Sequence, residues 1–142
     1  METQEIHRGR LIDHLQLVVR DLERSRRFYG AIFDVLGIPF GGEGPDYFWA
    51  DELFVSSATS SVAAGQLTGR VHLAFQAKDR ETVERFYREG LAAGGTDNGP
   101  PGLRPYHPDY YAAFLLDPDG NNIEAVYHGP GQRSAASVKI TF

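Results

Sequence analysis

The sequence predicts an α+β protein with two βαβββ modules, which form an open eight-stranded, barrel-like sheet with the helices outside. The first observation is an internal repeat: His14 and His72 lie 58 positions apart (72 − 14), as do Asp21 and Asp79 (79 − 21). The second is that each half begins with an alternating strand pattern followed by an amphipathic helix. Because neither half can bury a sheet face alone, we expect the two halves to pair into a single domain. The same offset relates Leu15 to Leu73, Glu23 to Glu81, Arg27 to Arg85, Phe28 to Phe86, Tyr29 to Tyr87 and Gly37 to Gly95.

The composition is that of an ordinary globular domain, with 142 residues of which 42% are apolar and 23% charged. The net charge of −5 and the lack of a basic cluster argue against a nucleic acid or an anionic membrane as partner. There is no cysteine, which excludes disulfides, thiolate metal sites and a cysteine nucleophile. The first ten residues contain no apolar signal segment, and no stretch reaches the length of a membrane helix. We therefore expect a cytoplasmic protein.

The first module covers about residues 11–60. Residues 11–19 alternate in polarity, as a strand with one face on the core does. Asp21 is expected to cap a helix, which Gly37 ends and Pro39 keeps from resuming. The apolar stripe of this helix consists of Leu22, Tyr29, Ile32, Phe33 and Leu36.

The first module closes with a hairpin. After a glycine-rich turn, residues 47–50 and 53–57 are expected to pair through Asp51 and Glu52. A linker of small and polar residues, 58–69, then separates the two halves.

The second module covers about residues 70–128 and repeats this plan. Residues 71–77 are the expected strand, and Asp79 caps a helix that Gly94-Gly95 ends. Residues 98–108 are rich in glycine and proline and are expected to be a loop.

A second hairpin closes this module. Its apolar runs, 112–116 and 123–127, are joined by the turn residues Asp117-Pro118-Asp119-Gly120. The C-terminal tail, residues 129–142, follows, and its end alternates weakly over 137–142, so that it can dock on a partner or on the domain's own edge. We assign no role to His7 or His128, which lie at the edges of the domain.

Three residues with metal-binding side chains are expected to share one face. Because side chains alternate along a strand, His14, His72 and Glu124 all fall on the face opposite the helices. A single histidine is often a satisfied core residue, and a single strand glutamate often lies on a solvated sheet surface. Together the three favour a divalent metal site, because two imidazoles and a carboxylate suit Fe(II), Mn(II), Zn(II) or Ni(II). Gln16 and Gln76 share this face, either as donors that orient the ligands or as polar surface.

The loop before the last hairpin concentrates His107, Tyr110 and Tyr111 with Arg104 and Tyr106. It can be a surface loop held by its prolines. It can also be a loop that positions a substrate and transfers protons, with His107, Tyr110 and Tyr111 as catalytic residues.

At these residues the chain resembles the vicinal oxygen chelate superfamily, which includes glyoxalase I, extradiol dioxygenases, fosfomycin-resistance transferases and bleomycin-resistance proteins. The matching motifs are His14 in IDHLQLVV, the helix DLERSRRFYGAIFDVLG, His72 in VHLAF, and DPDGNNIE, which ends at Glu124. They cover about residues 11–128. The resemblance implies that His14, His72 and Glu124 hold a divalent cation within paired modules, and that the protein is a homodimer.

The resemblance also implies a function. A family enzyme would act on a small molecule with vicinal oxygens and use the metal as a Lewis acid. Glyoxalase I typically has a further carboxylate on the last strand of the first module, but residues 53–57 have none, and Asp51 and Glu52 lie in the turn before them. The alternative is a metal-free protein of the bleomycin-resistance type, which sequesters an aromatic or cationic ligand. The inward triad distinguishes the two, because a sequestering protein does not need it.

Overall fold

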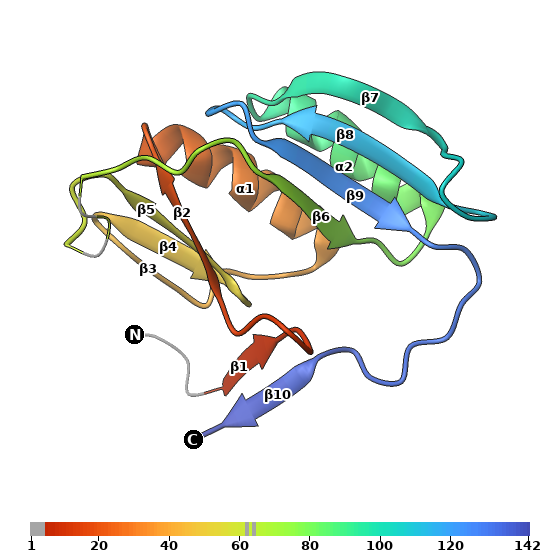
Figure 1. The fold of residues 1–142 in the computed structure, drawn as a ribbon, viewed down its shortest axis with the longest axis horizontal. Helices are drawn as coiled ribbons and strands as arrows, with labels where there is room; N and C mark the ends of the chain where they lie inside the picture. The colour runs from red at the N-terminus through yellow and green to blue at the C-terminus, as the bar shows by residue number, and fades with distance from the viewer. Residues whose placement is uncertain (1–4, 62, 64) are drawn as a thin grey trace. The chain divides into compact units, whose positions relative to one another are not determined.

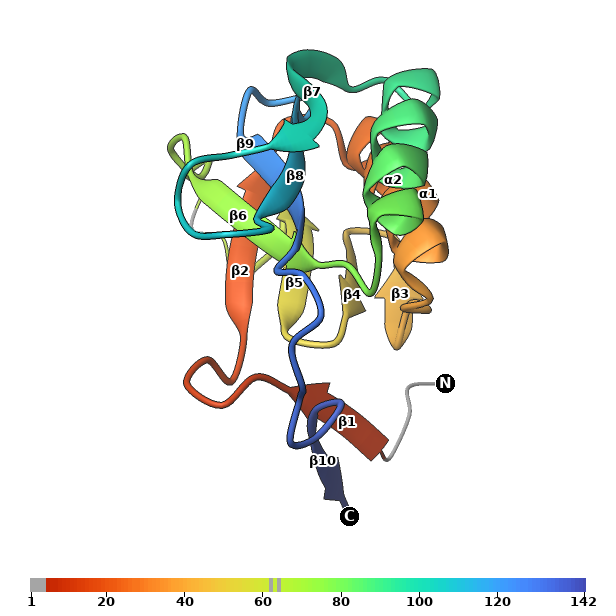
Figure 2. The same ribbon diagram turned by 90° about the vertical axis from the view of Figure 1, so that its right-hand side faces the viewer.

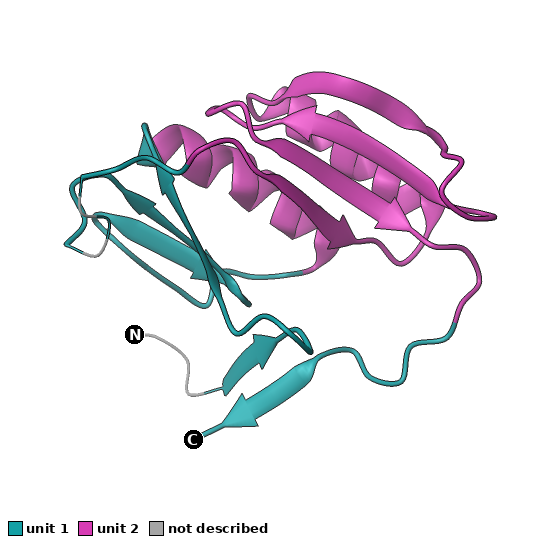
Figure 3. Cartoon of the chain, viewed as in Figure 1, with its two compact units in different colours: residues 1–22, 38–68, 132–142 teal, residues 23–37, 69–131 magenta. Residues whose placement is uncertain are grey.

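The structure is a computed structural model that describes residues 5–61, 63 and 65–142. It divides into two compact units, drawn in different colours in Figure 3. Unit 1 comprises residues 1–22, 38–68 and 132–142, and unit 2 comprises residues 23–37 and 69–131. Three groups of residues considered in the sequence lie outside the described part: 1–4 of the N-terminal segment, and 62 and 64 of the expected linker.

The order strand, helix, strand, strand, strand occurs twice, which confirms the predicted α+β class (Figure 1). The first half contains β2 (Leu15–Val19), α1 (Leu22–Leu36), β3 (Gly42–Gly44), β4 (Tyr47–Ala50) and β5 (Leu53–Ser57). The second half contains β6 (His72–Gln76), α2 (Arg80–Ala92), β7 (Thr96–Leu103), β8 (Tyr111–Leu116) and β9 (Asn122–Tyr127). Among the described residues, these strands form two open four-stranded sheets, in the orders β2-β5-β4-β3 and β6-β9-β8-β7.

The sheet of unit 1 contains the predicted hairpin at Asp51-Glu52. Strands β4 and β5 pair antiparallel, with Asp51 at a left-handed φ of 44° in the turn. Strand β2 pairs parallel to β5 and begins at Leu15, four residues later than the sequence pattern predicts. Strand β3, a short edge strand, lies where the sequence predicts a glycine-rich turn. Glycine is typical of turns, so its presence does not indicate a strand.

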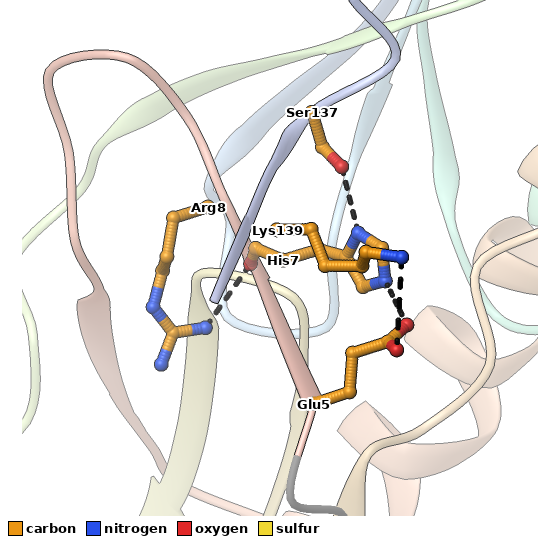
Figure 4. A network of polar contacts seen from close by, with 5 residues as sticks. All are labelled: Glu5, His7, Arg8, Ser137 and Lys139. Carbon is orange, nitrogen blue, oxygen red and sulfur yellow. Dashed lines mark hydrogen bonds and ion pairs between the residues drawn. The ribbon is translucent and has the colours of Figure 1, made fainter. Parts of the chain in front are cut away.

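Unit 1 also holds a two-stranded sheet of β1 (Glu5–Arg8) and β10 (Val138–Thr141). Figure 4 shows the polar contacts around them: His7 Nδ1 lies 2.6 Å from Ser137 Oγ, and Glu5 Oε2 lies 4.0 Å from Lys139 Nζ across the two strands. Within β1, His7 Nε2 lies 3.1 Å from Glu5 Oε1. The C-terminal tail thus pairs with the start of its own chain.

Glu52 offers a test of the electrostatics of unit 1. Burial and the neighbouring Asp51 charge raise the pKa of Glu52 above its usual value. A carboxyl with a raised folded-state pKa adds stability below its unfolded pKa of about 4.3, and this stability is lost as the pH rises through the folded pKa. Glu52→Gln is therefore expected to raise the melting temperature by roughly 1 °C near neutral pH and to leave it unchanged near pH 3. Thermal melts at both pH values test this, and a less stable variant at neutral pH would contradict it.

The sheet of unit 2 carries both helices on one face (Figure 2). Helix α1 joins this unit through the ring of Phe33, which meets Phe75 of β6 edge to face at 5.3 Å. It contacts α2 as well, since Arg27 donates to the Ala92 carbonyl over 3.0 Å. The helix of the first half therefore packs with the sheet of the second half.

The helix boundaries agree with the predicted caps. Asp79 accepts from the backbone N–H of Thr82 over 2.7 Å at the start of α2. Gly37 and Gly94 follow the two helices with φ of 75° and 106°, values that glycine adopts without a steric penalty. No helix within the described part of the chain is long and apolar enough to cross a membrane.

Strand β7 occupies most of the segment expected to be a loop. It pairs antiparallel with β8 at the edge of the sheet, and its register shifts between Asp97 and Gly99 and again between Gly99 and Gly102. An edge strand with bulges tolerates proline and glycine, because one row of its backbone groups needs no partner. The composition that argued for a loop is thus compatible with this strand.

The turn between β8 and β9 is held by the carboxylate of Asp117, which is only 4% exposed. It accepts from the backbone N–H groups of Asp119 and Asn121 and from the side chain of Asn121, at 2.8–2.9 Å. The Tyr29 hydroxyl of α1 donates to the same carboxylate over 2.5 Å. Asp117 thereby fixes both the reversal that positions β9 and the attachment of α1.

Candidate functional site

Glu124 lies in the middle of β9 and is a buried charged residue of unit 2. Its side chain is 3% exposed, so its charge is largely removed from water. Both carboxylate oxygens have partners: Oε1 lies 2.8 Å from Nε2 of His72, and Oε2 accepts from the Tyr110 hydroxyl. A buried carboxylate with these two partners avoids the cost of an unpaired charge.

Strand pairing explains why His72 reaches Glu124. Strands β6 and β9 are parallel, with Ala74 opposite Glu124 and His72 opposite Asn122. His72 is therefore two residues from the partner of Glu124 and on the same face of the sheet. Its side chain is 51% exposed, and its ring contacts Phe114 of β8 edge to face at 6.1 Å. One edge of the imidazole faces Glu124 while the rest of the ring remains open to solvent.

Tyr110 precedes β8 and closes the other side of Glu124. Burial of the hydroxyl, followed by the hydrogen bond to Glu124, raises the pKa of Tyr110 to about 12. The phenol therefore stays protonated near neutral pH and acts as a donor to Oε2.

Two further imidazoles lie beside Tyr110. His107 and His128 are within hydrogen-bonding distance, with Nε2 of His107 2.8 Å from Nδ1 of His128. The Tyr110 ring lies 5.2 Å from the His107 ring and 5.3 Å from the His128 ring, both edge to face. Tyr106 packs against Tyr110 in the same way at 5.0 Å. We did not expect His128 here, although the alternation along β9 extends to it from Glu124 through Val126.

Tyr111 points away from this group. Its hydroxyl donates to Glu84 of α2 over 2.8 Å, and the guanidinium of Arg80 lies 4.7 Å from the centre of its ring. Neighbouring residues on a strand face opposite sides, so Tyr110 reaches Glu124 and Tyr111 reaches the helix.

His14 belongs to unit 1, where it directly precedes β2. Its side chain is 64% exposed, and its Nδ1 lies 2.6 Å from Asp13 Oδ1. The hydrogen bond from His14 lowers the pKa of Asp13. On the following strand, Gln16 donates to Ser56 Oγ over 2.9 Å, which gives its amide a partner within the sheet.

The donors of unit 2 fit part of a divalent metal site. Two neighbouring ligand atoms, each about 2.1 Å from one cation, lie about 3 Å apart. The 2.8 Å between His72 Nε2 and Glu124 Oε1 is close to this spacing. No group of three or more His, Asp or Glu side chains placed to hold a metal ion occurs among the described residues. The structure thus brings together His72 and Glu124, which both lie in unit 2, whereas His14 lies in unit 1.

The fold agrees with the comparisons. Residues 11–125 match the family described as the glyoxalase/bleomycin resistance protein/dioxygenase superfamily, and the chain belongs to this family. A search of curated proteins finds no match.

Several solved structures are similar. A glyoxalase/bleomycin resistance protein from Albidiferax ferrireducens is 34% identical, with a TM-score of 0.67, 82% of this chain and 97% of that chain covered. A glyoxalase-related enzyme from Fulvimarina pelagi is 21% identical, with a TM-score of 0.70, 92% of this chain and 97% of that chain covered. A lactoylglutathione lyase from Agrobacterium tumefaciens is 19% identical, with a TM-score of 0.58, 83% of this chain and 93% of that chain covered. The last two show similarity of fold alone.

Proposed function

We propose that the protein is a metal-dependent enzyme that acts on a small molecule with vicinal oxygens. The observation that carries this proposal is the buried carboxylate of Glu124, whose two oxygens face the imidazole of His72 and the hydroxyl of Tyr110. Family membership supports the same class of function. His14, His72 and Glu124 are the proposed ligands of Fe(II), Mn(II), Zn(II) or Ni(II).

Each residue of unit 2 has a role in this proposal. His72 and Glu124 present a nitrogen and an oxygen that would hold the cation, which supplies Lewis acidity to substrate oxygens when bound. Tyr110 orients the carboxylate through Oε2 and, because its pKa is raised to about 12, remains a proton donor. His107 flanks Tyr110 and is exposed, so it is the candidate for exchanging a proton with solvent. Tyr111 has no catalytic role in this proposal, because its hydroxyl donates to Glu84 of α2.

The lyase activity of glyoxalase I itself is not part of the proposal. Strand β5 carries no carboxylate, and the nearby Glu52 lies in the turn before it, beside Gly9. A reaction that uses three protein ligands fits these residues better.

A second candidate is a metal-free protein that sequesters a ligand. The observation that favours it is the group of rings around Glu124, in which Tyr106 is 68% exposed and contacts Tyr110. Exposed aromatic faces beside a carboxylate suit a planar cationic ligand.

The test that separates the two candidates begins with protein purified without chelator. Metal content is measured, and the protein is then screened for turnover of small diols, hydroxy ketones and related vicinal oxygen compounds, with and without added metal. The enzyme proposal expects one metal ion per chain at the Glu124 site and turnover that chelation abolishes. Tight binding of a cationic aromatic ligand by metal-free protein, without turnover, would favour sequestration instead.

Tyr110→Phe tests the orientation of Glu124. The variant keeps the ring but loses the hydroxyl that donates to Oε2. Loss of a group that orients a metal ligand typically costs 10- to 100-fold in affinity, so we expect about tenfold weaker Mn(II) binding with unchanged stoichiometry. Isothermal titration measures both. Tyr87→Phe, which removes a hydroxyl bonded to Asp97 instead, is the matched control and should leave binding unchanged. Equal affinities for wild type and Tyr110→Phe would exclude this role.

We also propose, from the family alone, that the protein is a cytoplasmic homodimer.

A further inference from the structure

The imidazole pair His107 and His128 supplies no ligand to the proposed metal site. His107 lies in the loop between β7 and β8, and His128 directly follows β9. We infer that these two residues form a second cation site, separate from Glu124, that takes a divalent transition metal with a preference for imidazole, such as Zn(II), Ni(II) or Cu(II).

The protonation of His107 supports metal binding. Its Nδ1 lies 2.7 Å from the carbonyl oxygen of Pro108, which can only accept a hydrogen bond. In the neutral ring the proton therefore resides on Nδ1, and Nε2 carries the lone pair. Metal-binding histidines are held in the same way, because their second ring nitrogen almost always donates to a carbonyl or carboxylate. The lone pair of Nε2 points at His128 Nδ1.

The separation of the two nitrogens is close to that of a chelating pair. Zn–N bonds are about 2.0–2.1 Å, so two nitrogens on one tetrahedral ion lie roughly 3.3 Å apart. The observed separation is 2.8 Å, and the ring planes differ by 21° with centroids 5.1 Å apart. The ion would fit if the two nitrogens moved about half an ångström apart and the proton between them moved to His128 Nε2 or to solvent.

The loop that carries His107 is held against the end of β9. Asp109 adopts a left-handed φ of 66°, and its Cβ lies only 2.6 Å from where a side chain on Gly129 would begin. The Arg104 N–H donates to the Tyr110 carbonyl over 2.8 Å, which closes the loop. These contacts fix the approach of the two imidazoles before any ion binds, which lowers the entropic cost of binding.

The exposure of the pair sets the expected strength of binding. Both side chains face solvent, so water can complete the coordination. Since no third His, Asp or Glu is placed to complete a metal site in the described residues, the site should be weaker than one with three protein ligands.

The experiment isolates the pair by removing the first site. Glu124→Gln protein is titrated with Zn(II) by calorimetry, alone and combined with His128→Phe or His107→Phe, which keep an aromatic ring but no ligand. His7→Phe, on β1, is the control for loss of a half-buried histidine outside both sites. We expect Glu124→Gln protein to bind one Zn(II) per chain, with affinity reduced at least tenfold by either substitution in the pair and unchanged by His7→Phe.

A second measurement depends on no substitution in the pair. Cu(II) bound to Glu124→Gln protein should show electron paramagnetic resonance couplings to two imidazole nitrogens. Coupling to a single nitrogen, or Zn(II) affinity that His128→Phe leaves unchanged, would overturn the inference.

Discussion

Replacing Asp117 with alanine is expected to lower the free energy of unfolding by about 3 kcal/mol, because four donors lose one buried acceptor. These donors are two backbone N–H groups, the Asn121 amide and the Tyr29 hydroxyl, all within 2.5–2.9 Å of the carboxylate. Desolvation, followed by the Asp117 charge, raises the pKa of Tyr29 well above its usual value, so the hydroxyl remains a donor. Chemical denaturation should show the loss, which corresponds to roughly 10 °C in melting temperature for a protein of this size.

A graded control separates the turn from the helix attachment. Tyr29→Phe removes only one of the four bonds and should cost about 1 kcal/mol. Asp119→Ala leaves the Asp117 carboxylate in place, and its backbone N–H still donates to it. If Asp117→Ala costs no more than Tyr29→Phe, the carboxylate does not organise the turn as described.

Glu124→Gln is expected to abolish the stabilisation by Mn(II) while the fold survives. Glutamine keeps the shape of the side chain and an oxygen that accepts from Tyr110, but it removes the anion. A ligand at a thousandfold excess over its Kd stabilises a protein by ~4 kcal/mol, and this gain should be lost with the anion. Circular dichroism of the metal-free variant should match wild type. A variant that unfolds without metal would show that Glu124 has a structural role instead.

The sequence could predict those features whose signals are local. The caps at Asp79 and Gly94, and the hairpin at Asp51-Glu52, follow from side chains and backbone angles within a few residues. The contact between His72 and Glu124 follows from the alternation of side chains, because both residues lie on the same face of the paired strands β6 and β9.

Other features depend on partners far away in the chain. Asp117 reads as an ordinary turn residue, and nothing local indicates that Tyr29, 88 positions earlier, donates to it. The pairing of β1 with β10 joins the two ends of the described chain, and the short strands show only weak alternation. Strand β7 lies where the sequence predicts a loop, because proline and glycine exclude a central strand but not an edge strand.

The candidate site shows the same division. Composition pointed to the loop with His107 and Tyr110, since several imidazole and phenol groups stand close together there. Which tyrosine contacts Glu124 depends on the side of the sheet that each residue faces at the start of β8. The Tyr110 hydroxyl donates to Glu124, and the Tyr111 hydroxyl donates to Glu84. His128 acquires a partner only through the path of the loop, which no pattern within β9 reveals.

The central claim is that Glu124 belongs to a divalent metal site, and the most direct test is the metal-dependent shift in melting temperature of wild type, Glu124→Gln and Glu52→Gln. Mn(II) is the first choice, because two imidazoles alone suit it poorly; Zn(II), Ni(II) and anaerobic Fe(II) follow. We expect Mn(II) to raise the melting temperature of wild type and Glu52→Gln equally and that of Glu124→Gln hardly at all. If Glu52→Gln alone abolishes the shift, the ligand set is wrong and a further carboxylate from the first half is involved. If wild type shows no shift with any of the four metals, the account is contradicted and sequestration of a ligand takes its place.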